Sequence, residues 1–218
     1  MSLIFLPDLV SKLSTSGIIA VVVLEDPADA GAMADALLEG GICAVELALR
    51  TPRSIEALIA MRKHAPELLL GAGTVIRPEQ VKLAQDAGVD FAVAPGTNAR
   101  VLTAARAAKL PFAPGIVTPS DIETSLEYDC NVLKFFPAEP SGGLAYLRNM
   151  TAPYKHLGLH FIPLGGLNVE NVATYTEEPS VLAVGGSWVA PKDLIDRKDW
   201  KTVAARAREA VEIIRQNS

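Results

Sequence analysis

Short apolar segments alternate with longer segments of helical periodicity from one end of the chain to the other. The short segments are typical of strands buried on both faces. The longer ones repeat apolar residues at helical spacing. The predicted strands are Ile18–Leu24, Ala44–Leu49, Leu68–Ala72, Val89–Ala94, Phe112–Ala113, Val132–Phe136, Phe161–Leu164 and Val181–Val184. The predicted helices are Ala28–Glu39, Ile55–His64, Glu79–Ala87, Ala99–Ala108, Pro119–Tyr128, Gly143–Met150, Val169–Tyr175 and Lys201–Arg215.

The eight strand–helix repeats predict the fold class. No polar linker interrupts them, so we expect one α/β domain over residues 1–218, with a parallel sheet covered by helices. Eight repeats close a (β/α)8 TIM barrel, and Phe5–Leu13 is expected to form an extra N-terminal helix that caps its bottom. The alternative is an open Rossmann-like sheet, but the first strand is followed by Glu25-Asp26-Pro27 and not by a glycine-rich turn.

Lys134 lies inside the otherwise apolar strand Val132–Phe136, and both faces of that strand are predicted to be buried. The strand carries no carboxylate, and burying an ammonium without one costs several kcal/mol, so such a lysine tends to lose its proton. A neutral amine is a nucleophile that forms Schiff bases with carbonyl compounds. The alternative is a lysine whose side chain reaches solvent at the end of the strand.

Glu46 and Arg50 share one face of the second strand, and the opposite face is wholly apolar. Because the apolar face should meet the helices, both side chains are predicted to point into the barrel, roughly 13 Å apart at about 3.3 Å per residue. A carboxylate on the same interior as a nucleophilic lysine can move protons during Schiff-base chemistry. The alternative is a structural ion pair between Glu46 and Arg50 that fills the interior.

Glycines cluster at the predicted strand ends, where the active site of a TIM barrel lies. Taken singly, each is typical of a turn. The pairs after the last two strands, with Ser187 beside one, suit a phosphate held by backbone N–H groups and a helix N-terminus. Thr74 is the one polar side chain at the end of the third strand. The motifs are Gly71-Ala72-Gly73-Thr74, Pro95-Gly96, Pro114-Gly115, Gly165-Gly166 and Gly185-Gly186-Ser187.

Composition narrows the possible partners. A net charge of −5 without a basic cluster argues against nucleic acid, and no apolar run approaches the roughly 18 to 20 residues of a membrane span. Cys43 and Cys130 form no metal or redox motif, so both are expected to be reduced and buried in a cytoplasmic protein. His64, His156 and His160 have no acidic residue at ligand spacing, so no metal is expected.

Through these motifs the chain resembles the 2-keto-3-deoxy-6-phosphogluconate (KDPG) aldolases, which often also cleave 4-hydroxy-2-oxoglutarate (KHG). The resemblance implies a homotrimeric barrel and a lyase that needs neither metal nor cofactor. It also implies that Lys134 forms the Schiff base with the 2-oxo carbon and that Glu46 moves protons, commonly through a water. The segments that carry the resemblance are Gly41–Arg50, Gly71–Thr74, Pro95-Gly96, Pro114–Ile116, Lys134–Glu139 and Gly185–Trp188.

The same resemblance assigns the groups that bind substrate. Arg50 and Thr74 would hold the carboxylate of the pyruvyl half, and Pro95 and Phe136 would shape the pocket. The residues that would hold the phosphate are Gly165, Gly166, Gly185, Gly186 and Ser187.

Three positions depart from the commonest pattern of the family. Ala48 and Leu164 stand where threonines are usual, and Asp129 replaces a glycine before the lysine strand. Because neither Ala48 nor Leu164 supplies a catalytic group, the departures put substrate preference in question, not the chemistry. The alternatives are a 2-keto-3-deoxy-6-phosphogalactonate aldolase of the same family, a sugar-phosphate isomerase or epimerase barrel, and a barrel that only senses a sugar phosphate.

Overall fold

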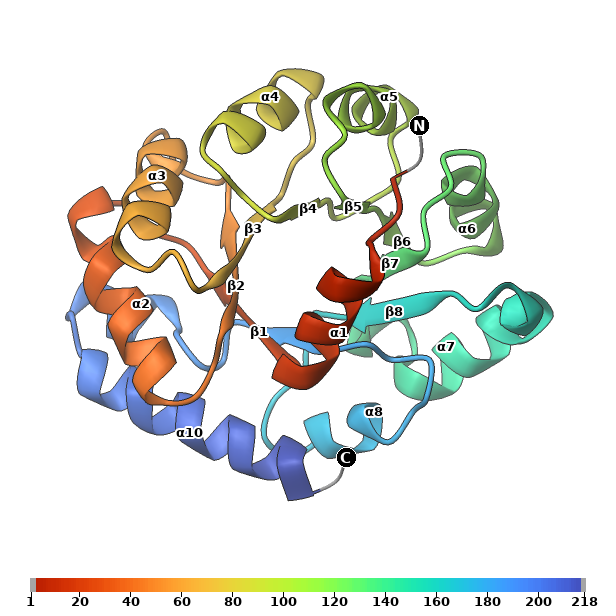
Figure 1. Ribbon diagram of the computed structural model, residues 1–218. Helices are drawn as coiled ribbons and strands as arrows, with labels where there is room; N and C mark the ends of the chain where they lie inside the picture. Colours follow the sequence, from red (N-terminus) through yellow and green to blue (C-terminus); the bar gives the residue numbers. More distant parts are fainter. Residues whose placement is uncertain (1–2, 217–218) are drawn as a thin grey trace.

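The computed structural model describes residues 3–216, so both ends of the predicted 1–218 domain lie outside the described range. Strands and helices alternate as predicted, and the strands curl around a centre with the helices outside them (Figure 1). The strands are β1 (Ile18–Val22), β2 (Ala44–Ala48), β3 (Leu69–Gly73), β4 (Phe91–Val93), β5 (Phe112–Ala113), β6 (Gly115–Ile116), β7 (Val132–Phe135), β8 (His160–Pro163) and β9 (Val184–Gly186). The α-helices are α1 (Pro7–Ser16), α2 (Ala30–Glu39), α3 (Ser54–His64), α4 (Pro78–Asp86), α5 (Ala99–Ala108), α6 (Pro119–Leu126), α7 (Gly143–Thr151), α8 (Val172–Thr176), α9 (Lys192–Asp196) and α10 (Trp200–Gln216). Short 3-10 helices are η1 (Pro27–Asp29), η2 (Glu139–Ser141) and η3 (Ala152–Leu157).

Hydrogen bonds join the strands into two parallel sheets, with the orders β5-β4-β3-β2-β1-β9 and β6-β7-β8. Isolated parallel bridges from Phe161 to Val181 and from Leu164 to Gly185 connect β8 with the segment that carries β9. The result is an α/β fold whose parallel sheet curls back on itself like part of a barrel. Within residues 3–216, no helix has the length and apolar character that crossing a membrane requires.

Apart from shifts of one or two residues at strand ends, the strands depart from the prediction at two places. The predicted fifth strand is β5, but an unpredicted strand, β6, follows it beyond Pro114, which has no N–H for the ladder; β5 pairs with β4 and β6 pairs with β7. The last strand was predicted at Val181–Val184, but β9 covers Val184–Gly186 and sets its two glycines opposite β1. The prediction placed these glycines after the strand as a phosphate-binding pair, whereas the missing side chains let the backbone continue extended against close neighbours.

Alternate residues of β1 belong to two different cores. Ile18, Ala20 and Val22 pack outward with the helices, whereas Ile19 and Val21 belong to the inner core enclosed by the strands. This division follows from the two-residue period of a strand. Every inward position is therefore a candidate for either core packing or the lining of a site.

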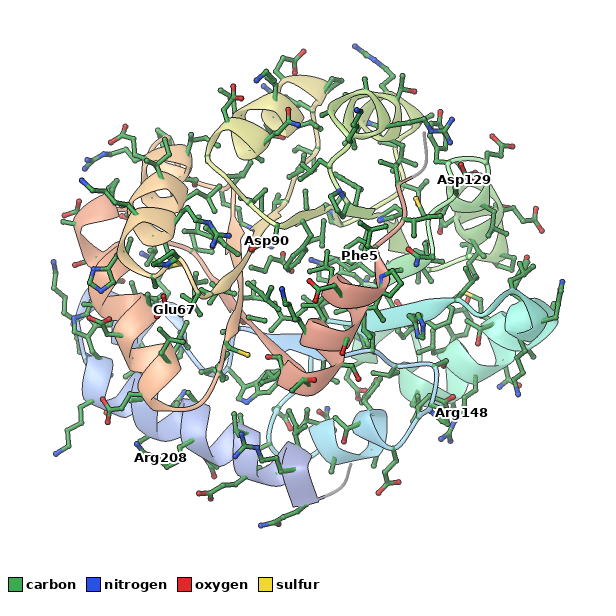
Figure 2. The ribbon with its side chains drawn as sticks, viewed as in Figure 1. Phe5, Glu67, Asp90, Asp129, Arg148 and Arg208 are labelled. Carbon is green, nitrogen blue, oxygen red and sulfur yellow. The ribbon has the colours of Figure 1, made fainter. Side chains whose placement is uncertain are left out.

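Helix α1 lies at the amino-terminal side of the strands, and Figure 1 draws it across the centre of the ring. It ends at Gly17, whose φ of 64° is the left-handed conformation that glycine adopts readily. Phe5 and Leu13 pack in the inner core. Figure 2 shows Phe5 near the centre, whereas Arg208 lies at the periphery. This end of the inner core is filled, which leaves the carboxyl-terminal ends of the strands for a site.

Asp129, which replaces a glycine of the family pattern, keeps a glycine-like backbone with a φ of 58°. Aspartate is among the residues that tolerate this left-handed region. Its carboxylate lies 3.8 Å from the guanidinium of Arg106, and Figure 2 shows it at the outer edge beside α6. This departure lies before the start of β7 and leaves the carboxyl end of the strand unchanged.

Candidate active site

Lys134 and Glu46 meet inside the curled sheet. Lys134 comes from β7 and Glu46 from β2, and Nζ of the lysine lies 3.0 Å from Oε1 and 3.2 Å from Oε2 of the glutamate. Lys134 is 4% exposed and Glu46 is 1% exposed. The lysine side chain is therefore buried, as the strand pattern predicts, and does not reach solvent.

This contact adds a partner that the strand of Lys134 lacks. Glu46, predicted to face the same interior, contacts the lysine from 88 residues away. The alternative in which Glu46 pairs with Arg50 is wrong, since the glutamate pairs with Lys134. A hydrogen-bonded acid and amine exchange protons directly, so Glu46 can take the proton of Lys134 and leave a nucleophilic amine.

Gly73, the last residue of β3, makes room for Glu46. A Cβ atom at this position would lie 2.2 Å from Oε1 of Glu46 and 2.6 Å from its Cγ. Any larger residue would displace the carboxylate from Lys134. The glycine that the sequence placed at a strand end is therefore required by the site and not only by a turn.

Arg50 and Thr74 are joined beside the pair. Nε of Arg50 donates to Oγ1 of Thr74 at 3.1 Å. The φ of Thr74 is 58°, a left-handed conformation that is a genuine outlier for a β-branched residue. Among the described residues, Arg50 forms no ion pair, so its guanidinium is available for an anionic ligand.

A pocket of about 530 Å³ opens at the carboxyl-terminal ends of the strands. The ring of Phe136 stands beside the reactive amine, with its centroid 5.4 Å from Nζ of Lys134. The predicted site residues that line the pocket are Glu46, Arg50, Lys134, Phe136, Gly165, Gly185, Gly186 and Ser187. The structure thus brings eight of the eleven predicted residues into one cavity, and Thr74 reaches it through Arg50.

Pro95 and Gly166 do not line this cavity. Pro95 is exposed, and its backbone packs on Gly115, where a Cβ would lie 2.2 Å from the proline carbonyl carbon. Gly166 has a φ of 85° and packs against Glu139. The predictions that Pro95 shapes the pocket directly and that Gly166 touches its contents are not supported by this placement.

Glu139 and Tyr175 fasten the loop that leads from Lys134. The hydroxyl of Tyr175 donates to Oε1 of Glu139. Burial first, and then this hydrogen bond, raise the pKa of Tyr175 above its ordinary value, so the hydroxyl remains a donor. The Glu139 N–H in turn donates to the carbonyl of Gly165 at 3.0 Å. These contacts hold the end of the β7 loop against the turn that follows β8.

The glycines of β9 have packing reasons as well as a place in the pocket. A Cβ on Gly185 would lie 2.5 Å from Leu164, and one on Gly186 would lie 1.6 Å from the ring of Trp188. Leu164 lines the pocket, so its departure from threonine removes a hydroxyl there. Ala48 is fully buried outside the lining, so its departure does not alter the cavity surface.

The sequence interpretation missed several lining residues: Val21, Val23, Leu164 (as a lining group), Ala190, Pro191, Lys192 and Ile195. Val21 and Val23 follow the inward period of the first strand and could have been predicted. Leu164 follows β8, and the others belong to α9 or to the connection that leads into it from β9, whose path the sequence pattern does not define. Lys192 is the cation among them.

No cluster of three or more potential metal ligands occurs within residues 3–216. His64 has no acidic residue at ligand spacing in the sequence, but the fold brings its Nε2 to 2.8 Å from Oδ1 of Asp35. The two residues come from α3 and α2, 29 positions apart, so sequence spacing could not reveal the contact. The pair is exposed, and neither residue lines the pocket.

A buried lysine beside a carboxylate, opening on a pocket at the carboxyl ends of parallel strands, defines an enzyme of the lysine-dependent aldolase class. Comparison with known proteins identifies the family. The model of the family described as "KDPG and KHG aldolase" matches residues 9–206. The chain belongs to the KDPG and KHG aldolase family.

Individual relatives cover nearly the whole chain. The 2-dehydro-3-deoxy-phosphogluconate aldolase of Treponema pallidum is 41% identical over 197 residues, 90% of this chain and 93% of that protein. The KHG/KDPG aldolase of Escherichia coli K12 is 38% identical over 202 residues, 93% of this chain and 94% of that protein. A crystal structure of KDPG aldolase from Legionella pneumophila, with pyruvate captured at low pH as a covalent carbinolamine intermediate, matches with a TM-score of 0.88. It is 35% identical and covers 95% of this chain and 98% of that chain.

Proposed function

We propose that this protein is a class I aldolase that cleaves KDPG reversibly to pyruvate and glyceraldehyde 3-phosphate, and that it also acts on KHG. The observation that carries the proposal is the buried Lys134–Glu46 pair, which opens onto the pocket. Membership of the KDPG and KHG aldolase family supports it. The carbinolamine captured in the Legionella enzyme supports the covalent route.

Lys134 is the nucleophile of this reaction. Its neutral amine adds to the 2-oxo carbon to give a carbinolamine, and loss of water gives a protonated imine. When a base removes the C4 hydroxyl proton, the imine accepts the electron pair of the C3–C4 bond, which leaves an enamine and the aldehyde. Protonation of the enamine at C3 and addition of water then release pyruvate and restore Lys134.

Glu46 is the proton carrier. With Oε1 at 3.0 Å from Nζ, it takes the first proton from Lys134 directly. It then supplies and removes protons at the atoms attached to Nζ, and reaches C3 through a water. Positioned acid–base groups of this kind contribute about 10² to 10⁴ in rate.

The substrate lies between the strand ends. Arg50, oriented by Thr74, binds the carboxylate of the pyruvyl half, because its planar fork can hold both oxygens. Gly165, Gly185, Gly186 and Ser187 hold the phosphate, and Phe136 bounds the carbon chain.

Pro95 and Gly166 act indirectly in this proposal. Pro95 packs on Gly115, and Gly115 is the register partner of Lys134 in the β6–β7 ladder. Gly166 leaves space for Glu139 in the turn after β8.

We extend the proposal to the architecture and setting. Residues 1–218 form one (β/α)8 domain with α1 as an additional helix, supported by the bridges that connect β8 with the β9 segment. The enzyme assembles as a homotrimer, as the family resemblance implies. It works in the cytoplasm, which suits its two free cysteines.

Pyruvate release from KDPG, its galactonate epimer and KHG, measured side by side with Lys134→Ala as blank, tests the function. We expect KDPG to lead in kcat/KM by about a hundredfold, or about 2.7 kcal/mol of transition-state discrimination. A lead for the galactonate compound would assign the enzyme to that epimer. Borohydride with pyruvate should add one reduced pyruvate to the mass of the wild type alone. An unchanged mass would favour an isomerase, an epimerase or a sensor, none of which forms an imine.

A further inference from the structure

Two cationic side chains that follow different strands, Arg50 and Lys192, line the pocket. Arg50 follows β2, and Lys192 begins α9, which follows β9; both line the cavity. In the sheet, β1 lies between β2 and β9. Because neighbouring strands are about 4.8 Å apart, the strands that lead to the two cations lie about 10 Å apart.

The surface between these two cations is not charged overall. Val21 and Val23, from β1 and its extension, line the pocket there. The Lys134–Glu46 pair carries no net charge, whichever partner holds the shared proton. A ligand that complements this pattern has an anionic group at each end and an uncharged carbon chain between them.

Lys192 has carboxylate neighbours in the free protein. Its Nζ lies 2.8 Å from Oε1 of Glu25 and 2.9 Å from Oδ1 of Asp196. The hydrogen bonds that Lys192 donates to these two carboxylates raise its pKa, so its ammonium persists at neutral pH. The three side chains are 64%, 70% and 54% exposed. Exposed ion pairs of this kind contribute little to stability, so a stronger anion can replace the carboxylates at small cost.

We infer that Lys192 is the side-chain cation that binds the terminal phosphate of the substrate, exchanging Glu25 and Asp196 for it. The inference rests on the proposed function and adds a determinant of selectivity for phosphorylated substrates. A phosphate carries up to two negative charges and three acceptor oxygens, so it competes well with a single carboxylate. Ser187 lines the same pocket and provides a hydroxyl as a further donor for the phosphate. KHG has a shorter chain without a phosphate and does not reach Lys192.

Removing the charge of Glu25 should have the opposite effect on phosphate binding from removing the charge of Lys192. Glu25 occupies Lys192 in the free protein, so it competes with the phosphate, and removal of its charge should tighten phosphate binding. If Lys192 only fastened α9 to the β1–α2 connection through Glu25, the two residues would form one structural contact. Loss of either partner would then have the same effect on activity.

The test compares Lys192→Met, Glu25→Gln and Lys198→Met with the wild type. Lys198 is a matched control, because its Nζ pairs with Asp29 at 2.6 Å and it does not line the pocket. The measurements are kcat/KM for KDPG and for KHG, and the dissociation constant of inorganic phosphate by calorimetry. We expect Lys192→Met to lower kcat/KM for KDPG by about tenfold to a hundredfold, chiefly through KM, and to leave KHG near the wild-type value. Glu25→Gln should tighten phosphate binding, and Lys198→Met should match the wild type.

Equal losses on KDPG and KHG in Lys192→Met would overturn the inference. A loss in Lys198→Met as large as in Lys192→Met would do the same. If the wild type released pyruvate from neither acid, the proposed function would fail. The phosphate measurement would still decide the role of Lys192, since unchanged phosphate binding in Lys192→Met contradicts it and weakened binding supports it.

Discussion

A Cβ atom on Gly73 would lie 2.2 Å from Oε1 of Glu46. The carboxylate therefore fills the space where β3 would otherwise carry a side chain. That space lets Glu46 lie across the inner core and reach Lys134 on β7. Gly73 takes no part in the reaction itself. It affects the reaction by leaving room for the Glu46 carboxylate beside Lys134.

Gly73→Ala should therefore lower kcat by about 10² to 10⁴, the contribution expected of a positioned acid–base group. It should also destabilise the protein by about 1–3 kcal/mol, because the methyl group overpacks a filled interior. Steady-state kinetics and urea unfolding measure the two effects. Gly96→Ala is the control, since a Cβ there meets nothing within 4 Å. Wild-type turnover in Gly73→Ala would contradict this account of Glu46.

Thr74→Gly should make the protein more stable and less active. The left-handed backbone of Thr74, with φ of 58°, costs about 1–2 kcal/mol. Glycine relieves that strain but gains freedom in the unfolded chain, so the net gain is about 0.5–1 kcal/mol. The variant also loses the hydroxyl that receives Nε of Arg50, so kcat/KM should fall. Thr74→Ser keeps the hydroxyl and should keep more activity, and a lower unfolding midpoint in Thr74→Gly would refute the strain argument.

Removing one member of the buried pair should destabilise more than removing both. Lys134→Met or Glu46→Gln alone leaves the other group buried without its partner, which costs about 3–5 kcal/mol. The double variant should lose less than the sum of the single losses. A double-mutant cycle in urea measures the coupling. Additive losses would show that the two groups do not stabilise one another in the folded protein.

Burial raises the pKa of the Cys130 thiol to about 12. The same thiol titrates near 8.5 in an unfolded chain, so the unfolded state loses this proton first as the pH rises. The free energy of unfolding should therefore decrease above about pH 8.5. This group alone should lower it by about 2 kcal/mol at pH 10. Urea unfolding at pH 7.5 and pH 10 measures the loss, which should be correspondingly smaller in Cys130→Ala. Equal losses in both proteins would contradict the prediction.

Local periodicity was enough to predict much of this arrangement. The inward position of Glu46 follows from the polar and apolar alternation of one strand, and the burial of Lys134 follows from the apolar residues around it. Both inferences use neighbours within a few positions in the sequence. The alternation of strands and helices could be predicted for the same reason.

What could not be predicted depends on contacts between distant segments. The Lys134–Glu46 contact joins residues 88 positions apart, and no spacing rule covers that separation. The separate strand β6 depends on which neighbours each side of Pro114 meets. The place of Lys192 beside the pocket depends on the path of the chain after β9, which local periodicity does not define.

The 88-residue separation of Glu46 and Lys134 also sets the interval between their syntheses on the ribosome. A ribosome that adds about 5–20 residues per second makes Lys134 roughly 4 to 18 s after Glu46. The pocket wall at Ser187 follows later still. A chain interrupted before β7 has the Glu46 carboxylate but not the Lys134 amine. A chain interrupted before β9 has both groups but not the complete binding site. Such fragments lack a complete reaction centre, so aldol cleavage requires a polypeptide that extends beyond β9.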